Sequence, residues 1–221
     1  MEYQKYLHPL FQPKLTAGNT FHLDLSIQNP DMKELDFKDV KSFDHYIFQK
    51  IKSAGKLYGY GGYLEEREIY RRSPLFGRKG DDIRRFHLGV DIWKEAGQAV
   101  YCPLDATVHS FQNNNNYGDY GPTIILKHEI KGQVFHTLYG HLSVQSLDGL
   151  YEGKIFSAGS KFCFLGDFPE NGDYPAHLHF QIIKDMDVYK GDYPGVSSEK
   201  EKNFYAENCP DPVLFFHELM Q

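Results

Sequence analysis

The sequence predicts a mainly β protein with an antiparallel core, and three observations support this prediction. Between residues 81 and 185, short runs rich in β-branched and aromatic residues alternate with turn-forming residues. The chain of 221 residues contains 17 Phe, 16 Tyr and 20 Gly, a combination that suits sheets joined by tight turns. Hydrophobic residues at 41% and charged residues at 24% are ordinary for a folded globular domain, which excludes a disordered or fibrous chain.

Residues 1–80 are predicted to form an accessory segment of mixed α and β structure. An extended stretch is expected over residues 21–27. In residues 41–53, apolar side chains recur four positions apart, which predicts an amphipathic helix. Its apolar face holds Phe43, Ile47 and Ile51. The glycine-rich and proline-containing stretch at residues 59–80 predicts a long loop or boundary before the core.

Residues 81–185 are predicted to form the core, an antiparallel sheet or barrel-sandwich. The expected strands are residues 86–93, 99–102, 106–111, 123–128, 134–142, 161–165 and 177–183. Lys131-Gly132 separates two of these runs and predicts a hairpin. The polar residues 113–122 predict a surface connection, with the wall of a binding groove as the alternative. Residues 186–221 are expected to be a tail that packs back onto the core through residues 213–216.

The charge and the apolar pattern exclude some classes of partner. A formal net charge of -6 and a pI of about 6.0 provide no general attraction to phosphate backbones, so nucleic acid is not an expected partner. The sequence contains neither a secretory signal pattern nor a run of about 18 apolar residues, so we expect a cytoplasmic chain without a membrane span. The 3 widely spaced cysteines are expected to be reduced thiols.

Residues 87–91 contain a histidine and a carboxylate four positions apart, in the pattern His-Leu-Gly-Val-Asp. If residues 86–93 form one strand, His87, Gly89 and Asp91 share a face, because side chains alternate between the two faces of a strand. Two possible metal ligands then converge with a glycine between them. Imidazole and carboxylate groups are ordinary ligands of catalytic zinc.

Three further histidines in the predicted strands belong to short motifs. His177 and His179 are two positions apart in one strand, so both imidazoles are expected on the same face. His141 lies at the end of another strand-like run, next to Gly140. Each motif alone occurs often by chance, but together they indicate a metal-dependent or catalytic site.

In this order, the three motifs resemble those of the lysostaphin-type zinc endopeptidases, metallopeptidase family twenty-three, which includes LytM-like enzymes. The pattern of that family is HxGxD, then YGHL, then HLHF. The chain has these patterns at residues 87–91, 139–142 and 177–180. The resemblance covers about residues 83–184 and implies an antiparallel β core with a metal in its groove.

By this resemblance, one zinc ion per chain is held by His87, Asp91 and His179. His141 and His177 are then the catalytic pair, without a decision on which of them is the base. The implied activity is a zinc metallopeptidase that hydrolyses peptide bonds through a metal-activated water. The implied substrates are peptides or peptidoglycan-derived peptides, including glycine-containing ones.

Two alternatives belong to other functional classes. One is a non-catalytic zinc-binding regulatory or binding module of the same fold, because relatives that have lost their ligands activate other enzymes. The presence of all five site residues favours the enzyme. The other is a phosphocarrier-like barrel with paired histidines, which Asp91 disfavours because its carboxylate would repel a phosphorylated histidine nearby.

Two features of the chain depart from the family pattern or lie outside it. Residues 167–176, which precede the His177 motif, form a longer loop than the short Gly- and Thr-containing turn usual at this place. Residues 58–70 precede the first ligand and are rich in polar and aromatic side chains. We expect the N-terminal segment, which contains this stretch, to line the groove or to block part of it.

Overall fold

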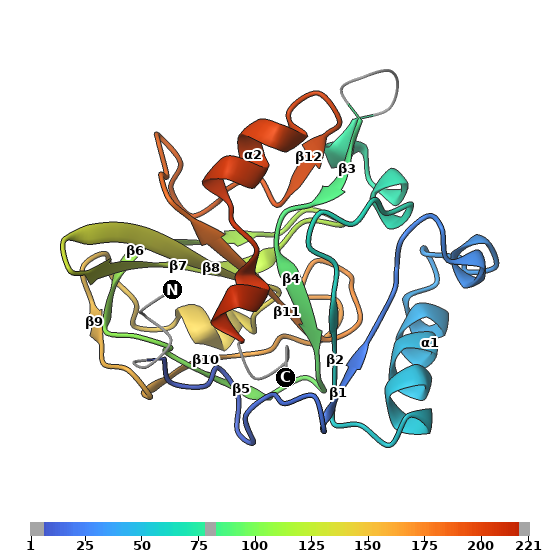
Figure 1. Ribbon diagram of the computed structural model, residues 1–221, viewed down its shortest axis with the longest axis horizontal. Helices are drawn as coiled ribbons and strands as arrows, with labels where there is room; N and C mark the ends of the chain where they lie inside the picture. Colours follow the sequence, from blue (N-terminus) through green and yellow to red (C-terminus); the bar gives the residue numbers. More distant parts are fainter. Residues whose placement is uncertain (1–6, 78–82, 217–221) are drawn as a thin grey trace.

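The computed structural model describes residues 7–77 and 83–216, and within them the chain is built on one large sheet. The strand order of this sheet is β1-β2-β4-β11-β8-β7-β6-β9 (Figure 1). Its strands are β1 (Thr20–His22), β2 (Tyr58–Gly61), β4 (Val90–Trp93), β11 (His177–Ile183), β8 (Gln133–Gly140), β7 (Gly121–Ile130), β6 (Ala106–Asn114) and β9 (Ile155–Phe156). All neighbours pair antiparallel except β1 and β2. The prediction of a mainly β, antiparallel core is therefore confirmed.

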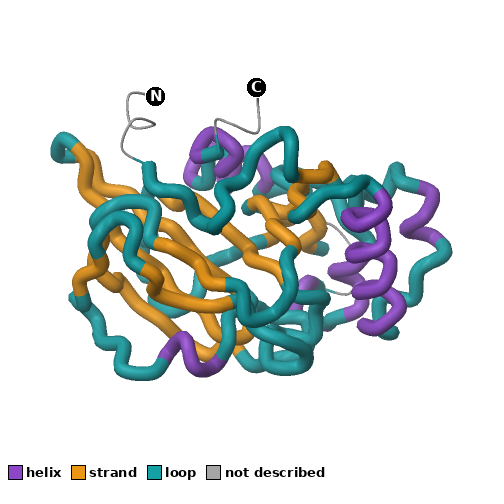
Figure 2. The backbone as a smooth tube through the Cα atoms, turned by 90° about the horizontal axis from the view of Figure 1, so that it is seen from below, coloured by secondary structure: helices purple, strands orange, loops and turns teal. Residues whose placement is uncertain are grey.

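Two small sheets accompany the large one in the described part of the chain. One pairs β10 (Lys161–Phe164) with β5 (Ala99–Tyr101), and the other pairs β12 (Val196–Ser198) with β3 (Arg84–His87). The helices lie outside the main stack of strands, as Figure 2 shows. They are α1 (Val40–Ser53), α2 (Lys202–Asn208) and the short 3-10 helices Pro30–Lys33, Ile69–Arg72, Pro74–Phe76, Val144–Leu147 and Pro212–Phe215.

The predicted hairpin is confirmed as β7 and β8, with Ile130 opposite Gln133. Lys131 and Gly132 form its two-residue turn with φ values of 51° and 78°. Two consecutive positive φ values are the geometry that matches the twist of paired strands, and glycine adopts them most readily.

The prediction of one continuous strand over residues 86–93 is wrong. The chain changes partners at Leu88 and Gly89, since β3 pairs with β12 while β4 pairs with β11 and β2. A side chain at Gly89 would have its Cβ 2.6 Å from His179 Cε1, so the backbone passes close to that imidazole. The break places His87 and Asp91 on separate strands of separate sheets.

The predicted helix of the N-terminal segment is confirmed as α1. Phe43, Ile47 and Ile51 are buried on one face, and the Asp39 side chain accepts a hydrogen bond from the backbone N–H of Ser42 at the start of the helix. The helix lies against β1 and β2, at the end of the large sheet (Figure 1).

Part of the stretch at residues 59–80, predicted as a long loop or boundary, is a strand. β2 pairs with β4, with Gly59 opposite Trp93, so the large sheet continues from the core into the N-terminal segment. A Cβ at Gly59 would lie 2.5 Å from Leu23 Cδ1, which shows why a small residue fits there. The predicted boundary between residues 80 and 81 lies outside the described residues, and the division into domains stays a prediction.

The C-terminal segment packs on the main hydrophobic core through Val213, Phe215 and Phe216, in the apolar run expected to do so. Cys102, Cys163 and Cys209 are buried free thiols. Within residues 7–77 and 83–216, none of the helices combines the length and the apolar character needed to cross a membrane.

Candidate functional site

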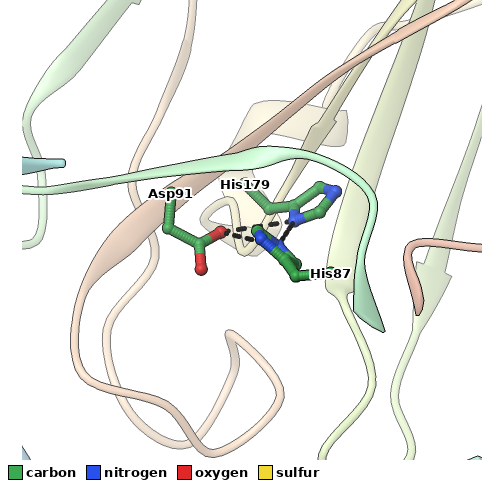
Figure 3. A group of neighbouring side chains, drawn as sticks. All are labelled: His87, Asp91 and His179. Carbon is green, nitrogen blue, oxygen red and sulfur yellow. Dashed lines mark hydrogen bonds and ion pairs between the residues drawn. The ribbon is translucent and has the colours of Figure 1, made fainter. Parts of the chain in front are cut away.

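Three possible metal ligands meet where β3, β4 and β11 approach one another (Figure 3). His87 ends β3, Asp91 lies in β4, and His179 lies in β11 directly opposite Asp91. All three side chains are buried, with at most 3% of their residue surface exposed. The fold thus brings together two residues four positions apart and a third from a distant strand.

The separations of the three ligand atoms suit one small cation. His87 Nε2 lies 2.8 Å from His179 Nδ1, and Asp91 Oδ1 lies 3.3 Å from each of these nitrogens. Ligand atoms at tetrahedral positions around zinc, each ~2.0 to 2.1 Å from the ion, are about 3.3 Å apart. Asp91 Oδ1 is also buried without a hydrogen-bond partner. A bound cation would satisfy this buried oxygen, so the residues fit a zinc ion.

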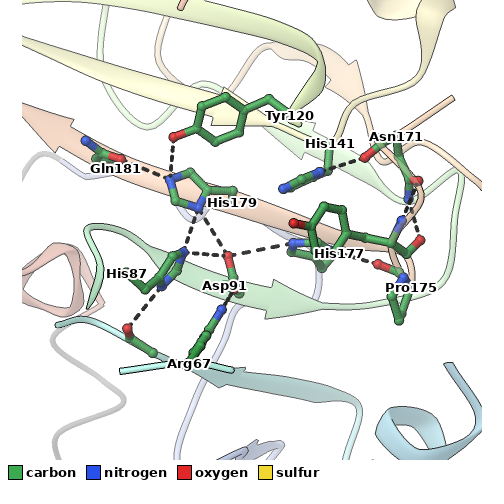
Figure 4. A network of polar contacts seen from close by, with 12 residues as sticks. Arg67, His87, Asp91, Tyr120, His141, Asn171, Pro175, His177, His179 and Gln181 are labelled. Carbon is green, nitrogen blue, oxygen red and sulfur yellow. Dashed lines mark hydrogen bonds and ion pairs between the residues drawn. The ribbon is translucent and has the colours of Figure 1, made fainter. Parts of the chain in front are cut away.

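Outer hydrogen bonds orient both imidazoles toward this point (Figure 4). His87 Nδ1 lies 3.0 Å from the carbonyl oxygen of Gly62, and donation to this oxygen leaves Nε2 with its lone pair. His179 Nε2 lies 3.0 Å from Gln181 Oε1, and donation there leaves Nδ1 free to bind. Gln181 is itself held because its Nε2 donates to the carbonyl of Pro194. Such outer partners set the tautomer of metal-binding histidines.

The second oxygen of Asp91 is bound by a buried arginine. Arg67 Nη1 donates to Asp91 Oδ2 at 2.5 Å, and Arg67 Nε donates to Glu65 Oε2 at 2.5 Å. Figure 4 shows the guanidinium on the opposite side of the carboxylate from His179. Asp91 therefore presents only Oδ1 to the two histidines.

His141 and His177 lie beside this cluster without belonging to it. Their ring centroids are 4.2 Å apart, and His177 Nε2 lies 3.8 Å from Asp91 Oδ1. His141 directly follows β8 with φ of 61°, a left-handed conformation uncommon for residues other than glycine. The residue before it, Gly140, is paired with His179 in β11, so His141 lies next to the cluster in the sheet.

The long loop at residues 167–176 orients both of these histidines. His141 Nδ1 lies 2.7 Å from the carbonyl oxygen of Asn171, and His177 Nδ1 lies 2.7 Å from that of Pro175. The Asn171 amide in turn donates to the carbonyl of Tyr174, which holds the loop in shape. With Nδ1 as the donor, each ring keeps its Nε2 lone pair for chemistry.

Burial sets the charge of these groups. It lowers the pKa of His87 to about 3 and holds the pKa of His141 well below its usual value. The pKa of His177 is also lowered, first by burial. Burial alone would raise the pKa of Asp91, but His87 and Arg67 outweigh it and hold this pKa well below the usual value. At neutral pH, His87, His141 and His177 are therefore neutral imidazoles beside the ionised carboxylate of Asp91.

A cavity of about 270 Å³ opens onto the cluster. Its walls come from the core and from both flanking segments. Among the lining residues are Phe43, Arg67, Ile69, Tyr70, Phe76, Trp93, Tyr120, Tyr174, Tyr193 and Val196, together with the five histidine and aspartate residues described above. Residues 58–70 thus contribute to the cavity wall, as the sequence predicts, and most of the wall is aromatic or apolar.

The structure brings together all five residues that the sequence singles out, while their separate roles stay a prediction. The sequence prediction missed Arg67, Gly62 and Gln181. Gln181 follows His179 by two positions in β11, and this spacing on a strand face is the one signal that could have found it. Arg67 lies in a stretch expected to be a loop, and no local pattern links it to Asp91.

One family model matches the part of the chain that contains the site. The model of Peptidase family M23 matches residues 85–191, a range that contains His87, Asp91, His141, His177 and His179. Arg67 and Gly62 lie outside this range. No curated protein matches the sequence.

Several solved structures are similar to this chain. The catalytic domain of the antimicrobial peptidase lysostaphin from Staphylococcus simulans is 23% identical, over 55% of this chain and 80% of that chain, with a TM-score of 0.38. A zinc-containing peptidase from Vibrio cholerae is 23% identical, over 56% of this chain and 33% of that chain, with a TM-score of 0.35. A chain of the SpoIIIAH and SpoIIQ complex is 16% identical, over 67% and 92% of the two chains, with a TM-score of 0.41. The matched part is thus about a third of the Vibrio protein.

Proposed function

We propose that this chain, whose residues 85–191 belong to peptidase family M23, is a zinc-dependent endopeptidase. The observation that carries the proposal is the buried trio of His87, Asp91 and His179, with its ligand atoms 2.8 to 3.3 Å apart. A zinc ion bound there supplies a Lewis acid and a water of lowered pKa.

The five site residues then have two kinds of role, metal binding and proton transfer. His87, Asp91 and His179 would hold the ion, three protein ligands being the number usual in catalytic zinc sites. His141 and His177 present neutral Nε2 atoms on one side of the trio. A neutral imidazole can accept a proton from the attacking water or, once protonated, stabilise the developing oxyanion. Their placement supports these two roles without separating them.

The lining of the cavity supports a peptide as the substrate. Flat aromatic side chains such as Tyr70, Tyr120 and Tyr193 line the cavity that opens onto the trio. Family membership supports peptidoglycan-type or glycine-containing peptides as the first class to test. The aromatic wall supports peptides with an apolar residue next to the cleaved bond as the second class.

A cleavage panel tests this proposal. The zinc-loaded protein is incubated with glycine-rich, D-alanine-containing and ordinary peptides, and the products are identified by mass. His177→Ala serves as the control, because it keeps the three proposed ligands. We expect cleavage of at least one class by the wild-type protein and cleavage at least roughly 100-fold slower by the control. A wild-type protein that binds zinc and cleaves no peptide would instead support the non-catalytic binding module.

A further inference from the structure

Arg67 is a buried cation that touches a proposed metal ligand from outside the matched family segment. Its side chain is 4% exposed, and it bridges two carboxylates, those of Glu65 and Asp91. The Trp93 ring lies over its guanidinium, 5.9 Å from Cζ, and shields one face. Burying a charge is costly unless it is paired, and the guanidinium is paired with both carboxylates.

The backbone fixes Arg67 relative to the metal cluster. The N–H of Leu64 donates to the carbonyl of His87, and the N–H of His87 donates to the carbonyl of Glu65. The N–H of Arg67 donates to the carbonyl of Arg85, two residues before His87 in β3. Residues 64–67 therefore run beside β3, and the backbone from which the Arg67 side chain extends is bonded to the strand that holds His87.

Arg67 also binds a second carboxylate, that of Glu65. Glu65 Oε2 accepts the Nε proton at 2.5 Å, and Glu65 Oε1 accepts the backbone N–H of Leu25 at 3.0 Å. Arg67 thus divides its hydrogen bonds between Glu65 and Asp91, and Asp91 Oδ1 receives none of them. The contact with Oδ2 sets the direction in which the Asp91 carboxylate points.

We infer that Arg67 is a positioning residue for the metal centre, which engages Asp91 Oδ2 and so presents Oδ1 alone to the ion. This inference rests on the proposed metal site. Oδ1 lies 3.3 Å from both His87 Nε2 and His179 Nδ1, the place from which a single oxygen completes the trio. The same segment also orients His87 through the carbonyl of Gly62. Residues 58–70 thus supply outer contacts to two of the three ligands, in addition to lining the cavity.

Zinc affinity and coordination test the inference with the full chain. The variants are Arg67→Gln and Arg67→Lys, and the matched control is Arg85→Gln, which removes the Arg85–Glu66 ion pair but no contact to a ligand. Zinc affinity is measured by competition with a chromogenic chelator. Cobalt(II) is then used as a spectroscopic probe of coordination number. Outer partners of metal ligands typically contribute 10- to 100-fold in affinity.

We expect both Arg67 variants to bind zinc about 10- to 100-fold more weakly than wild type, with Arg85→Gln unchanged. Their cobalt absorption should weaken, because the released Oδ2 can join the ion and raise its coordination number. Lysine keeps the positive charge but has no planar fork, so Arg67→Lys decides the question if Arg67→Gln does not fold. Wild-type affinity and spectrum in Arg67→Lys, or tighter zinc binding in Arg67→Gln, would overturn the inference. A wild-type chain that binds no zinc would instead overturn the proposed function.

Discussion

His141 and His177 face each other with their ring centroids 4.2 Å apart, and both Nδ1 atoms lie 2.7 Å from carbonyl oxygens of one loop. That loop, residues 167–176, is the one predicted from the sequence to be longer than the turn usual in lysostaphin-type peptidases. Its carbonyl oxygens set the tautomer and the direction of two imidazoles. Neither ring belongs to the three-ligand cluster, so the proposed proton transfer and the proposed metal binding fall on different residues.

The first prediction follows from this separation. His141→Ala and His177→Ala keep all three proposed ligands, so each variant should still bind about one zinc per chain. Peptide hydrolysis should fall by at least roughly 100-fold, because general acid–base groups typically contribute ~10²- to 10⁴-fold. Metal content by mass spectrometry and initial rates on one cleaved peptide measure the two effects. Loss of zinc from His177→Ala would reverse the roles assigned to His177 and His179.

Replacing a proposed metal ligand should instead reduce zinc binding, and activity should be lost as a consequence. His87→Ala, Asp91→Ala and His179→Ala each remove one of three protein ligands, so zinc affinity should fall sharply and activity should disappear with the metal. Added zinc in excess should restore part of the activity only in these variants. Competition with a chelator measures the affinity. A His179→Ala variant with wild-type affinity would exclude His179 from the ligand set.

Gly62→Ala tests the contact between the N-terminal segment and the cluster. An added Cβ would lie 1.9 Å from Arg67 Nη2 and 3.0 Å from His87 Nδ1, at a backbone φ of +106°. The guanidinium is held by two carboxylates and cannot easily retreat. We expect a loss of roughly 2 to 4 kcal/mol in the free energy of unfolding, from backbone strain and overpacking together.

Gly132→Ala is the matched control for this substitution. Gly132 also has a positive φ, of +78°, but no atom lies within 4 Å of its added Cβ. It should lose only about 1 kcal/mol, the contribution of the backbone alone. Denaturant unfolding of the two variants measures the difference. Equal losses would show that the space between Gly62 and Arg67 is not tightly packed.

The free energy of unfolding at acid pH should depend on His128, a buried residue outside the proposed metal site. Burial lowers its pKa to about 4 from an ordinary value of 6.5. Between these pH values the unfolded chain binds a proton that the folded chain does not, so the free energy of unfolding decreases as pH falls from about 6.5 to about 4. The shift corresponds to roughly 3 kcal/mol.

His128→Gln removes this titration, so its unfolding free energy should change less between pH 7 and pH 4 than that of wild type, by up to roughly 3 kcal/mol. Replacement of the exposed His45 by Gln provides a control with the same change of residue type. Urea unfolding at a series of pH values gives the comparison. Parallel profiles for wild type and His128→Gln would show that His128 does not stay neutral in the folded chain.

The elements with strong local patterns could be predicted from the sequence. Helix α1 has apolar residues on one face, and β11 has the alternation that places His177 and His179 on the same side. The five site residues could be predicted because they lie in short motifs whose combination and order resemble one family. Such patterns predict secondary structure because the spacing of side chains on one face follows directly from the backbone geometry of a helix or strand.

The elements that depend on distant contacts could not be predicted. β2 contains two glycines, which are poor strand formers alone, and it is a strand because β4 provides hydrogen-bond partners. The strand break at Leu88 and Gly89 exists because β3 and β4 join different sheets. The contact between Arg67 and Asp91 joins residues 24 positions apart and leaves no local trace in the sequence.

A zinc titration coupled to peptide cleavage tests the central claim most directly. Metal-free protein is titrated with zinc while hydrolysis of a peptide from the panel is followed by mass. Hydrolysis should rise in proportion to zinc and reach its maximum at about one zinc per chain, with His177→Ala binding the same zinc without cleavage. Hydrolysis that is independent of zinc, or a chain that binds no zinc, would contradict the account.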